Sequence, residues 1–251
     1  MELTANEAHL YFSQPEEITD PALLQHYESL LTGDELTRMS RFYFARHRHQ
    51  YLVTRALIRT TLSSYFHVDP TEWRFGKNAY GKPEISLGDT TWPIRFNLSH
   101  CDGLVLCGVT REVDIGVDVE DTQRSAVAAP EQLSSYFSET EIAELVHLPK
   151  EQRKSRFFDY WTLKESYIKA RGMGLAIPLS SFSFHFEGNN LNGFSIHPSL
   201  EDDANKWQFR QMVMNHHYRI ALALNTSSDV EVKGFKIVPL LDKKPETLKF
   251  L

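Results

Sequence analysis

The stretch IGVDVE at residues 115–120 is the part of the sequence on which the fold and the site depend. Three aliphatic residues alternate with Gly116, Asp118 and Glu120, which is the period-two pattern of a half-buried strand. The two carboxylates are about 7 Å apart along one strand face, where they repel each other and a cation would relieve the repulsion. Hard oxygen ligands with room for water and phosphate suit magnesium. The alternative is a solvated strand face beside a turn.

A second pattern lies 45 residues downstream, in a predicted helix over residues 151–171 that ends at Gly172. Trp161, Glu165 and Lys169 follow one another at intervals of four and therefore share a helix face. A Glu four residues before a Lys is also a common surface pair that stabilises helices. Set against the carboxylates of the strand, however, Glu165 would complete an oxygen-rich magnesium site. Lys169 would then neutralise a phosphate bound to that metal.

The composition restricts the class of protein. The chain has 251 residues and a net charge of -6, so its overall charge does not favour binding to nucleic acid or to a membrane surface. The two cysteines, together with a start that lacks a signal-peptide pattern, predict a reduced cytoplasmic protein. No apolar run is long enough to span a bilayer. The one dense basic cluster lies between Arg38 and His49 and is the candidate anion site.

The remaining patterns predict a mixed α+β protein. Ser138 and Glu141 form a capping box for a helix, Asp34 is a candidate helix cap, and Ser99 is a candidate cap for a turn after the strand at residues 94–98. Residues 122–132 read as an exposed connector, and the chain from Pro239 onward as a loosely attached tail. Further helices are predicted at residues 21–31 and 34–43, from there to about residue 66, and at 139–146. Further strands are predicted at residues 2–12, 73–75, 104–109, 182–186, 207–213 and 218–224.

Two segments suggest an internal duplication. Residues 38–62 and 153–175 share an SRF sequence near their starts, and both precede strands. We therefore expect a pseudo-dimer of two similar α/β halves with antiparallel sheets, over residues 1–113 and 114–251, and an active site in the cleft between them.

Three blocks of the sequence resemble the 4'-phosphopantetheinyl transferases of the surfactin-synthetase-activating type. They are FNLSHCDG at residues 96–103, IGVDVED at 115–121 and WTLKESYIKARGMGL at 161–175, in the order and spacing of that family. Weaker similarity extends the resemblance over roughly residues 35–185. The resemblance implies transfer of the phosphopantetheine arm of coenzyme A to a serine of an apo acyl or peptidyl carrier protein, with release of adenosine 3',5'-bisphosphate. It also implies a monomer rather than a compact trimer.

The resemblance implies roles for individual residues as well. Asp118, Glu165 and Lys169 would be catalytic, and Glu165 is our candidate for the base that accepts the serine proton. Asp118 and Glu165, together with Glu120, would hold Mg²⁺ on the coenzyme A diphosphate. The contacts to coenzyme A itself would be made by Arg38, Arg41, Lys82, Ser99, His100 and Lys169, with Lys82 lying by the adenine.

Two other functions fit the same residues. A metal-dependent nucleotide phosphohydrolase would use the three carboxylates to activate water, and it would hydrolyse coenzyme A without a carrier protein. A non-catalytic carrier-protein-binding homologue is the other alternative, but the complete set of Asp118, Glu120, Glu165 and Lys169 disfavours it.

Overall fold

The computed structural model describes residues 2–88, 92–123 and 130–251, so most of the connector predicted at 122–132 lies outside the described residues. The chain divides into two compact units. Unit 1 contains Met1–Gly76, Pro83–Glu112 and Val230–Thr247, and unit 2 contains Lys77–Lys82, Val113–Asp229 and Leu248–Leu251. The halves expected from the sequence differ from these units in two segments and at Val113, which clusters with unit 2. Residues 230–247 cluster with unit 1, and the short Lys77–Lys82 segment clusters with unit 2.

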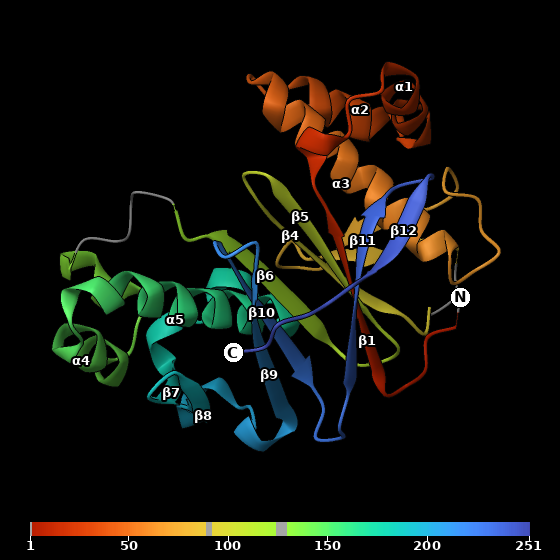
Figure 1. Ribbon diagram of the computed structural model, residues 1–251. Coiled ribbons are helices and arrows are strands. Elements are labelled where there is room, and N and C mark those ends of the chain that lie inside the picture. The colour runs from red at the N-terminus through yellow and green to blue at the C-terminus, as the bar shows by residue number, and fades with distance from the viewer. Residues whose placement is uncertain (1, 89–91, 124–129) are drawn as a thin grey trace. The chain divides into compact units, whose positions relative to one another are not determined.

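Unit 1 is built on a five-stranded sheet with the strand order β12-β11-β1-β5-β4 (Figure 1). Strands β1 and β11 are parallel, and the other neighbours in the sheet are antiparallel. Its elements are the helices α1 (Pro21–Leu30), α2 (Gly33–Ser40) and α3 (Ala45–Ser63), and the strands β1 (Glu7–Ser13), β3 (Pro83–Ile85), β4 (Arg95–Cys101), β5 (Leu104–Thr110), β11 (Glu231–Val238) and β12 (Asp242–Glu246), with β2 (Phe75–Lys77) paired to β3 at its boundary.

Unit 2 contains a three-stranded antiparallel sheet with the order β6-β10-β9, and a long helix, α5, lies against β6 and β10 (Figure 1). A hairpin of β7 and β8 and the shorter helix α4 complete this unit. Its elements are β6 (Ile115–Asp121), α4 (Glu139–His147), α5 (Lys150–Arg171), β7 (Phe182–Glu187), β8 (Asn190–Ile196), β9 (Trp207–Met214) and β10 (Tyr218–Asn225). The α+β class with mainly antiparallel sheets is confirmed.

Local signals explain where the helices of unit 2 begin and end. Ser138 accepts a hydrogen bond from the Glu141 backbone, and Glu141 accepts one from the Ser138 backbone, so the predicted capping box is confirmed. Helix α5 ends at Gly172, which has a left-handed conformation with φ of 69°. Glycine adopts this conformation without the steric penalty of a side chain.

Three local predictions are wrong. Helix α2 is capped by Thr32 instead of Asp34, because Thr32 and Glu35 form a reciprocal capping box. The residues after Pro239 are not a loose tail, since β12 pairs with β11 from Asp242 to Glu246 and the Val213 N–H donates to the Lys249 carbonyl. Ser99 does not cap a turn. Strand β4 continues through it to Cys101 and pairs with β5 as far as Leu104.

A buried ion pair holds α5 in unit 2. The ammonium of Lys164 lies 2.8 Å from the Glu141 carboxylate and donates to the carbonyls of Leu179 and Phe182, and both charged side chains are fully buried. These contacts place Lys164 inside the unit, and α5 also packs against β6. Among the described residues, no helix is long and apolar enough to cross a membrane.

Candidate active site

The carboxylate face of β6 is covered by α5 and is not a solvated strand face. Asp118 is only 4% exposed, and the first five residues of the strand are all buried. Gly116 makes this close packing possible. A β-carbon at that position would lie 1.9 Å from the Ser166 carbonyl oxygen and 2.4 Å from the Ala170 backbone nitrogen. The backbone of the helix therefore contacts the strand at Gly116, which is one residue before Val117 and two residues before Asp118.

The predicted helix face meets the strand carboxylates directly. The Lys169 ammonium donates to Asp118 Oδ1 at 2.6 Å, and the Trp161 indole N–H donates to Glu120 Oε1 at 3.0 Å. Glu165 lies between Trp161 and Lys169 on the helix, so its carboxylate is half-buried among those of Asp118 and Glu120. The structure therefore brings together all four residues that the sequence assigned to the metal and catalytic groups in this unit.

Electrostatics single out Glu165 within this group. Burial raises the pKa of Glu165 to about 7; Lys169 opposes the rise, and the charges of Asp118 and Glu120 add to it. A carboxyl group whose pKa lies near neutrality is typical of sites that transfer protons or bind cations. The structure thus favours a functional interpretation of this face over a surface ion pair.

The residues fit a divalent cation by their donor chemistry. Three carboxylates in a partly desolvated place supply hard oxygen ligands. Burial first, and then the charges of Asp118 and Glu120, raise the pKa of Glu165, and a dication would favour its ionised form. Among the described residues, no group of three or more His, Cys, Asp or Glu side chains is already arranged around one point as a metal cage. Asp118 instead binds the Lys169 ammonium.

The residues predicted to bind phosphate in unit 1 occupy two places. Arg38 lies in the last turn of α2 and Arg41 is its C-cap, and both line an open hollow of about 600 Å³ together with Asp34, Thr37 and Phe42. On β4, the His100 side chain is exposed, whereas Ser99 is buried. The two β4 residues point to opposite faces of the strand because successive side chains alternate.

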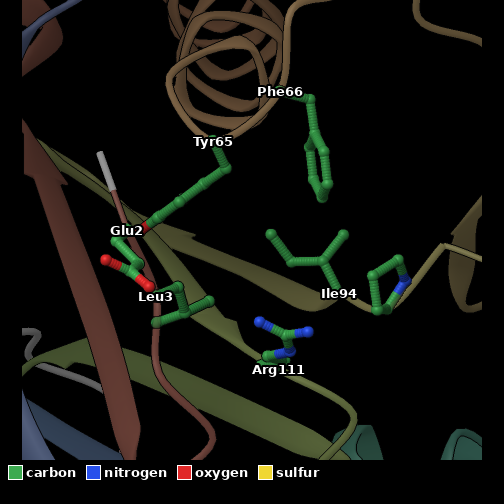
Figure 2. A pocket seen from close by; sticks show the side chains of 7 residues that line it. Glu2, Leu3, Tyr65, Phe66, Ile94 and Arg111 are labelled. Carbon is green, nitrogen blue, oxygen red and sulfur yellow. The ribbon is translucent and has the colours of Figure 1, made fainter.

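A second hollow in unit 1 contains no residue predicted for the site. It has a volume of about 230 Å³ and is lined by Leu3, Tyr65, Phe66, Pro93 and Ile94 together with the charged residues Glu2 and Arg111 (Figure 2). Its lining is therefore mainly apolar.

Lys82 was expected beside an adenine, and its ammonium in the structure donates to backbone carbonyls of unit 2. It lies 2.9 Å from the Ala170 oxygen and 3.4 Å from the Ile115 oxygen. The sequence marks Asn78, four residues before Lys82, as part of a turn-rich loop but not as a site residue; its amide donates to the Gly172 carbonyl at 2.7 Å. The signal was available in the sequence, because Asn followed by Gly and Pro marks a turn with side-chain hydrogen bonds.

The comparisons with known proteins identify the family of the chain. The 4'-phosphopantetheinyl transferase superfamily matches residues 114–223, and the 4'-phosphopantetheinyl transferase N-terminal family matches residues 20–110. The chain is 36% identical to 4'-phosphopantetheinyl transferase HetI of Nostoc sp. over 178 residues, covering 69% of this chain and 72% of that protein. It is 32% identical to 4'-phosphopantetheinyl transferase Sfp of Bacillus subtilis over 160 residues, covering 63% and 68%.

A third relative, the 4'-phosphopantetheinyl transferase gsp of Aneurinibacillus migulanus, is 31% identical over 173 residues, covering 69% of each chain. These matches define the class of protein: an enzyme that transfers a phosphopantetheinyl group. The chain belongs to the 4'-phosphopantetheinyl transferase superfamily, in its Sfp-like branch.

The raised pKa of Glu165 predicts a pH-dependent stability difference. Its pKa of about 7 in the folded protein exceeds the ordinary value of 4.5, so ionisation of Glu165 destabilises the fold as the pH rises through this interval. Glu165→Gln, which cannot ionise, should therefore be more stable than the wild type at pH 8 and equal to it near pH 4.5. Each pKa unit corresponds to about 1.4 kcal/mol, and partial exposure reduces the sum, so we expect about 2 kcal/mol.

Urea unfolding of both proteins at pH 5 and pH 8, in the presence of a chelator, measures this difference. Glu151→Gln is the matched control, because Glu151 is exposed on the same helix. A Glu165→Gln variant that gains no stability at pH 8 would show that this carboxyl group titrates normally.

Proposed function

We propose that the enzyme transfers the 4'-phosphopantetheine arm of coenzyme A to a serine of an acyl or peptidyl carrier protein, with magnesium as its cofactor. The observation that carries this proposal is the group on α5 and β6, in which Glu165 has a pKa near 7 beside two further carboxylates and Lys169. We also propose that the enzyme is a monomer in the cytoplasm and binds neither nucleic acid nor membranes.

The reaction needs a proton acceptor and charge neutralisation. The serine oxygen forms a bond to the phosphorus that carries the pantetheine arm, and the bond from that phosphorus to the diphosphate bridging oxygen breaks. Adenosine 3',5'-bisphosphate leaves with the bridging oxygen. A group with a pKa near the working pH is the most effective acceptor for the serine proton, which supports Glu165 as the base.

The other residues would bind and orient the donor. We assign Asp118, Glu120 and Glu165 to Mg²⁺, which when bound would neutralise charge on the diphosphate. Lys169, now on Asp118, is close enough to these carboxylates to reach a diphosphate bound among them. Arg38 and Arg41, which line one hollow, together with Ser99, His100 and Lys82, remain our proposed contacts to the phosphates and adenine of coenzyme A.

The direct test is mass spectrometry of candidate apo-carrier proteins incubated with coenzyme A, magnesium and this enzyme. We expect a mass gain of one phosphopantetheinyl group, located on a serine by fragmentation, and no gain in excess chelator. Coenzyme A incubated without any carrier should stay intact. Consumption of coenzyme A without a carrier, with no modified serine, would instead indicate the phosphohydrolase.

His100 provides a prediction for unit 1. Because its exposed imidazole is proposed to bind a phosphate, His100→Ala should raise the apparent KM for coenzyme A about tenfold, the loss expected for one charge-assisted hydrogen bond. If the contact is to the 3'-phosphate, dephospho-coenzyme A should distinguish the variant from the wild type much less. His26→Ala, at an exposed position of α1, is the control. An unchanged preference between the two donors would refute this assignment.

A further inference from the structure

The Lys77–Lys82 loop has a closed internal structure within unit 2. The side-chain oxygen of Asn78 accepts hydrogen bonds from the backbone of Tyr80 at 2.9 Å and of Lys82 at 3.0 Å. The Asn78 N–H donates to the Lys82 carbonyl at 3.0 Å, and Gly81 takes a φ of 93° that favours glycine. The two ends of the loop are therefore fixed with respect to each other.

Two side chains of this loop bind the C-terminal end of α5. The Asn78 amide donates to the Gly172 carbonyl at 2.7 Å, and the Lys82 ammonium donates to the Ala170 carbonyl at 2.9 Å. The fit is close, since a β-carbon on Gly172 would lie 3.0 Å from both Asn78 Nδ2 and Lys82 Cδ. The last carbonyls of a helix have no partner within the helix and carry its negative dipole end, so an amide N–H and an ammonium are suited to this place.

The same ammonium also reaches the first residue of β6, with its nitrogen 3.4 Å from the Ile115 carbonyl oxygen. Lys82 therefore links the two elements that carry the proposed site. Its acceptor on the helix, Ala170, directly follows Lys169, and its acceptor on the strand lies three residues before Asp118. Lys169 and Asp118, which are in contact at 2.6 Å, are therefore each within three residues of a carbonyl that Lys82 binds.

We propose that Lys82 and Asn78 are positioning residues, which fix the end of α5 on β6 and thereby set the place of Lys169 relative to Asp118. This inference rests on the proposed function of those two residues. It gives Lys82 a role through α5 and β6, in addition to the donor contact predicted from the sequence. The two roles differ in what they predict for the kinetics of variants.

Loss of positioning should lower turnover, because a displacement of about 1 Å in a reacting group can cost up to about 100-fold in rate. We expect Lys82→Met and Asn78→Ala each to lower kcat at least about tenfold, and Asn78→Ala to change the KM for coenzyme A less than about threefold. Asn78→Ala is the sharper variant, because Asn78 carries no charge that could bind a phosphate. Lys82→Arg, which keeps a donor and the charge, should recover part of kcat.

Lys77→Met is the matched control, since it removes the same charge from the same loop at an exposed position. It should leave both constants near their wild-type values. A Lys82→Met variant that raises KM about tenfold with unchanged kcat, or an Asn78→Ala variant with wild-type kcat, would overturn the positioning role.

Amide hydrogen exchange separates this inference from the proposed function, because it needs neither coenzyme A nor a carrier. In Lys82→Met and Asn78→Ala, protection of the amides from Lys169 to Gly172 should fall at least about tenfold, while that of Leu163 in the middle of α5 should not change. Unchanged protection at Lys169 to Gly172 would overturn the inference even if transfer activity is present. Absence of transfer by the wild type, with lowered protection in the variants, would contradict only the proposed function.

Discussion

Glu165→Gln is expected to lose about 10²- to 10⁴-fold in turnover while coenzyme A still binds, because the change removes the proposed base and a proposed metal ligand but no positive charge. The half-buried carboxylate has a pKa of about 7 among Asp118, Glu120 and Lys169, which fits both roles. The two roles are associated with different pKa values of Glu165. A bound dication would lower it, whereas a base works best with a pKa near neutrality.

Lys169→Ala should give a different result from the same helix face. The ammonium now binds Asp118 at 2.6 Å and is proposed to supply positive charge to the diphosphate, so its loss should weaken both coenzyme A binding and turnover. Calorimetric titration of coenzyme A into both variants, with and without magnesium, measures binding, and steady-state rates measure turnover. Glu151→Gln on the exposed part of α5 is the control for the lost carboxylate.

Two outcomes would contradict this division of roles. One is a Glu165→Gln variant that keeps its rate, and the other is a Lys169→Ala variant that binds coenzyme A as tightly as the wild type. The titration also distinguishes the two roles of Glu165. If magnesium still strengthens coenzyme A binding to Glu165→Gln, then Glu165 acts mainly as a base.

The part of the site that the sequence predicts well is the part that depends on local periodicity. The alternation in IGVDVE gives the carboxylate face of β6, and the four-residue spacing of Trp161, Glu165 and Lys169 gives the facing side of α5. Each of these patterns lies within one element. The capping box of Ser138 and the glycine end of α5 are equally local, and both were predicted correctly.

The parts that were missed depend on partners distant in the sequence. Strand β11 pairs with β1 at the other end of the chain, with Glu231 opposite Glu7. No local sequence pattern predicts such a parallel pairing. Strand β12, in the segment that was expected to be a loose tail, pairs in turn with β11. The carbonyls that Lys82 binds are also not visible in the sequence, because backbone acceptors are present at every residue.

The last prediction concerns Gly116, whose missing side chain lets α5 and β6 meet. Gly116→Ala should destabilise the protein by about 3 kcal/mol, at the upper end of what overpacking costs. The added β-carbon would lie 1.9 Å from the Ser166 carbonyl oxygen and 2.4 Å from the Ala170 nitrogen. Both are backbone atoms of α5, so no side-chain rotation or truncation can relieve the clash, and the helix must move away from the strand.

That movement should separate Lys169 from Asp118, since Ala170 is the next residue of the helix, and we therefore expect turnover to fall about 100-fold. Calorimetric melting and steady-state kinetics of Gly116→Ala measure the two losses. The control is Gly33→Ala at the start of α2, where a β-carbon would meet nothing within 4 Å. If Gly116→Ala melts and turns over like the wild type, close backbone packing of α5 on β6 is not what holds the site together.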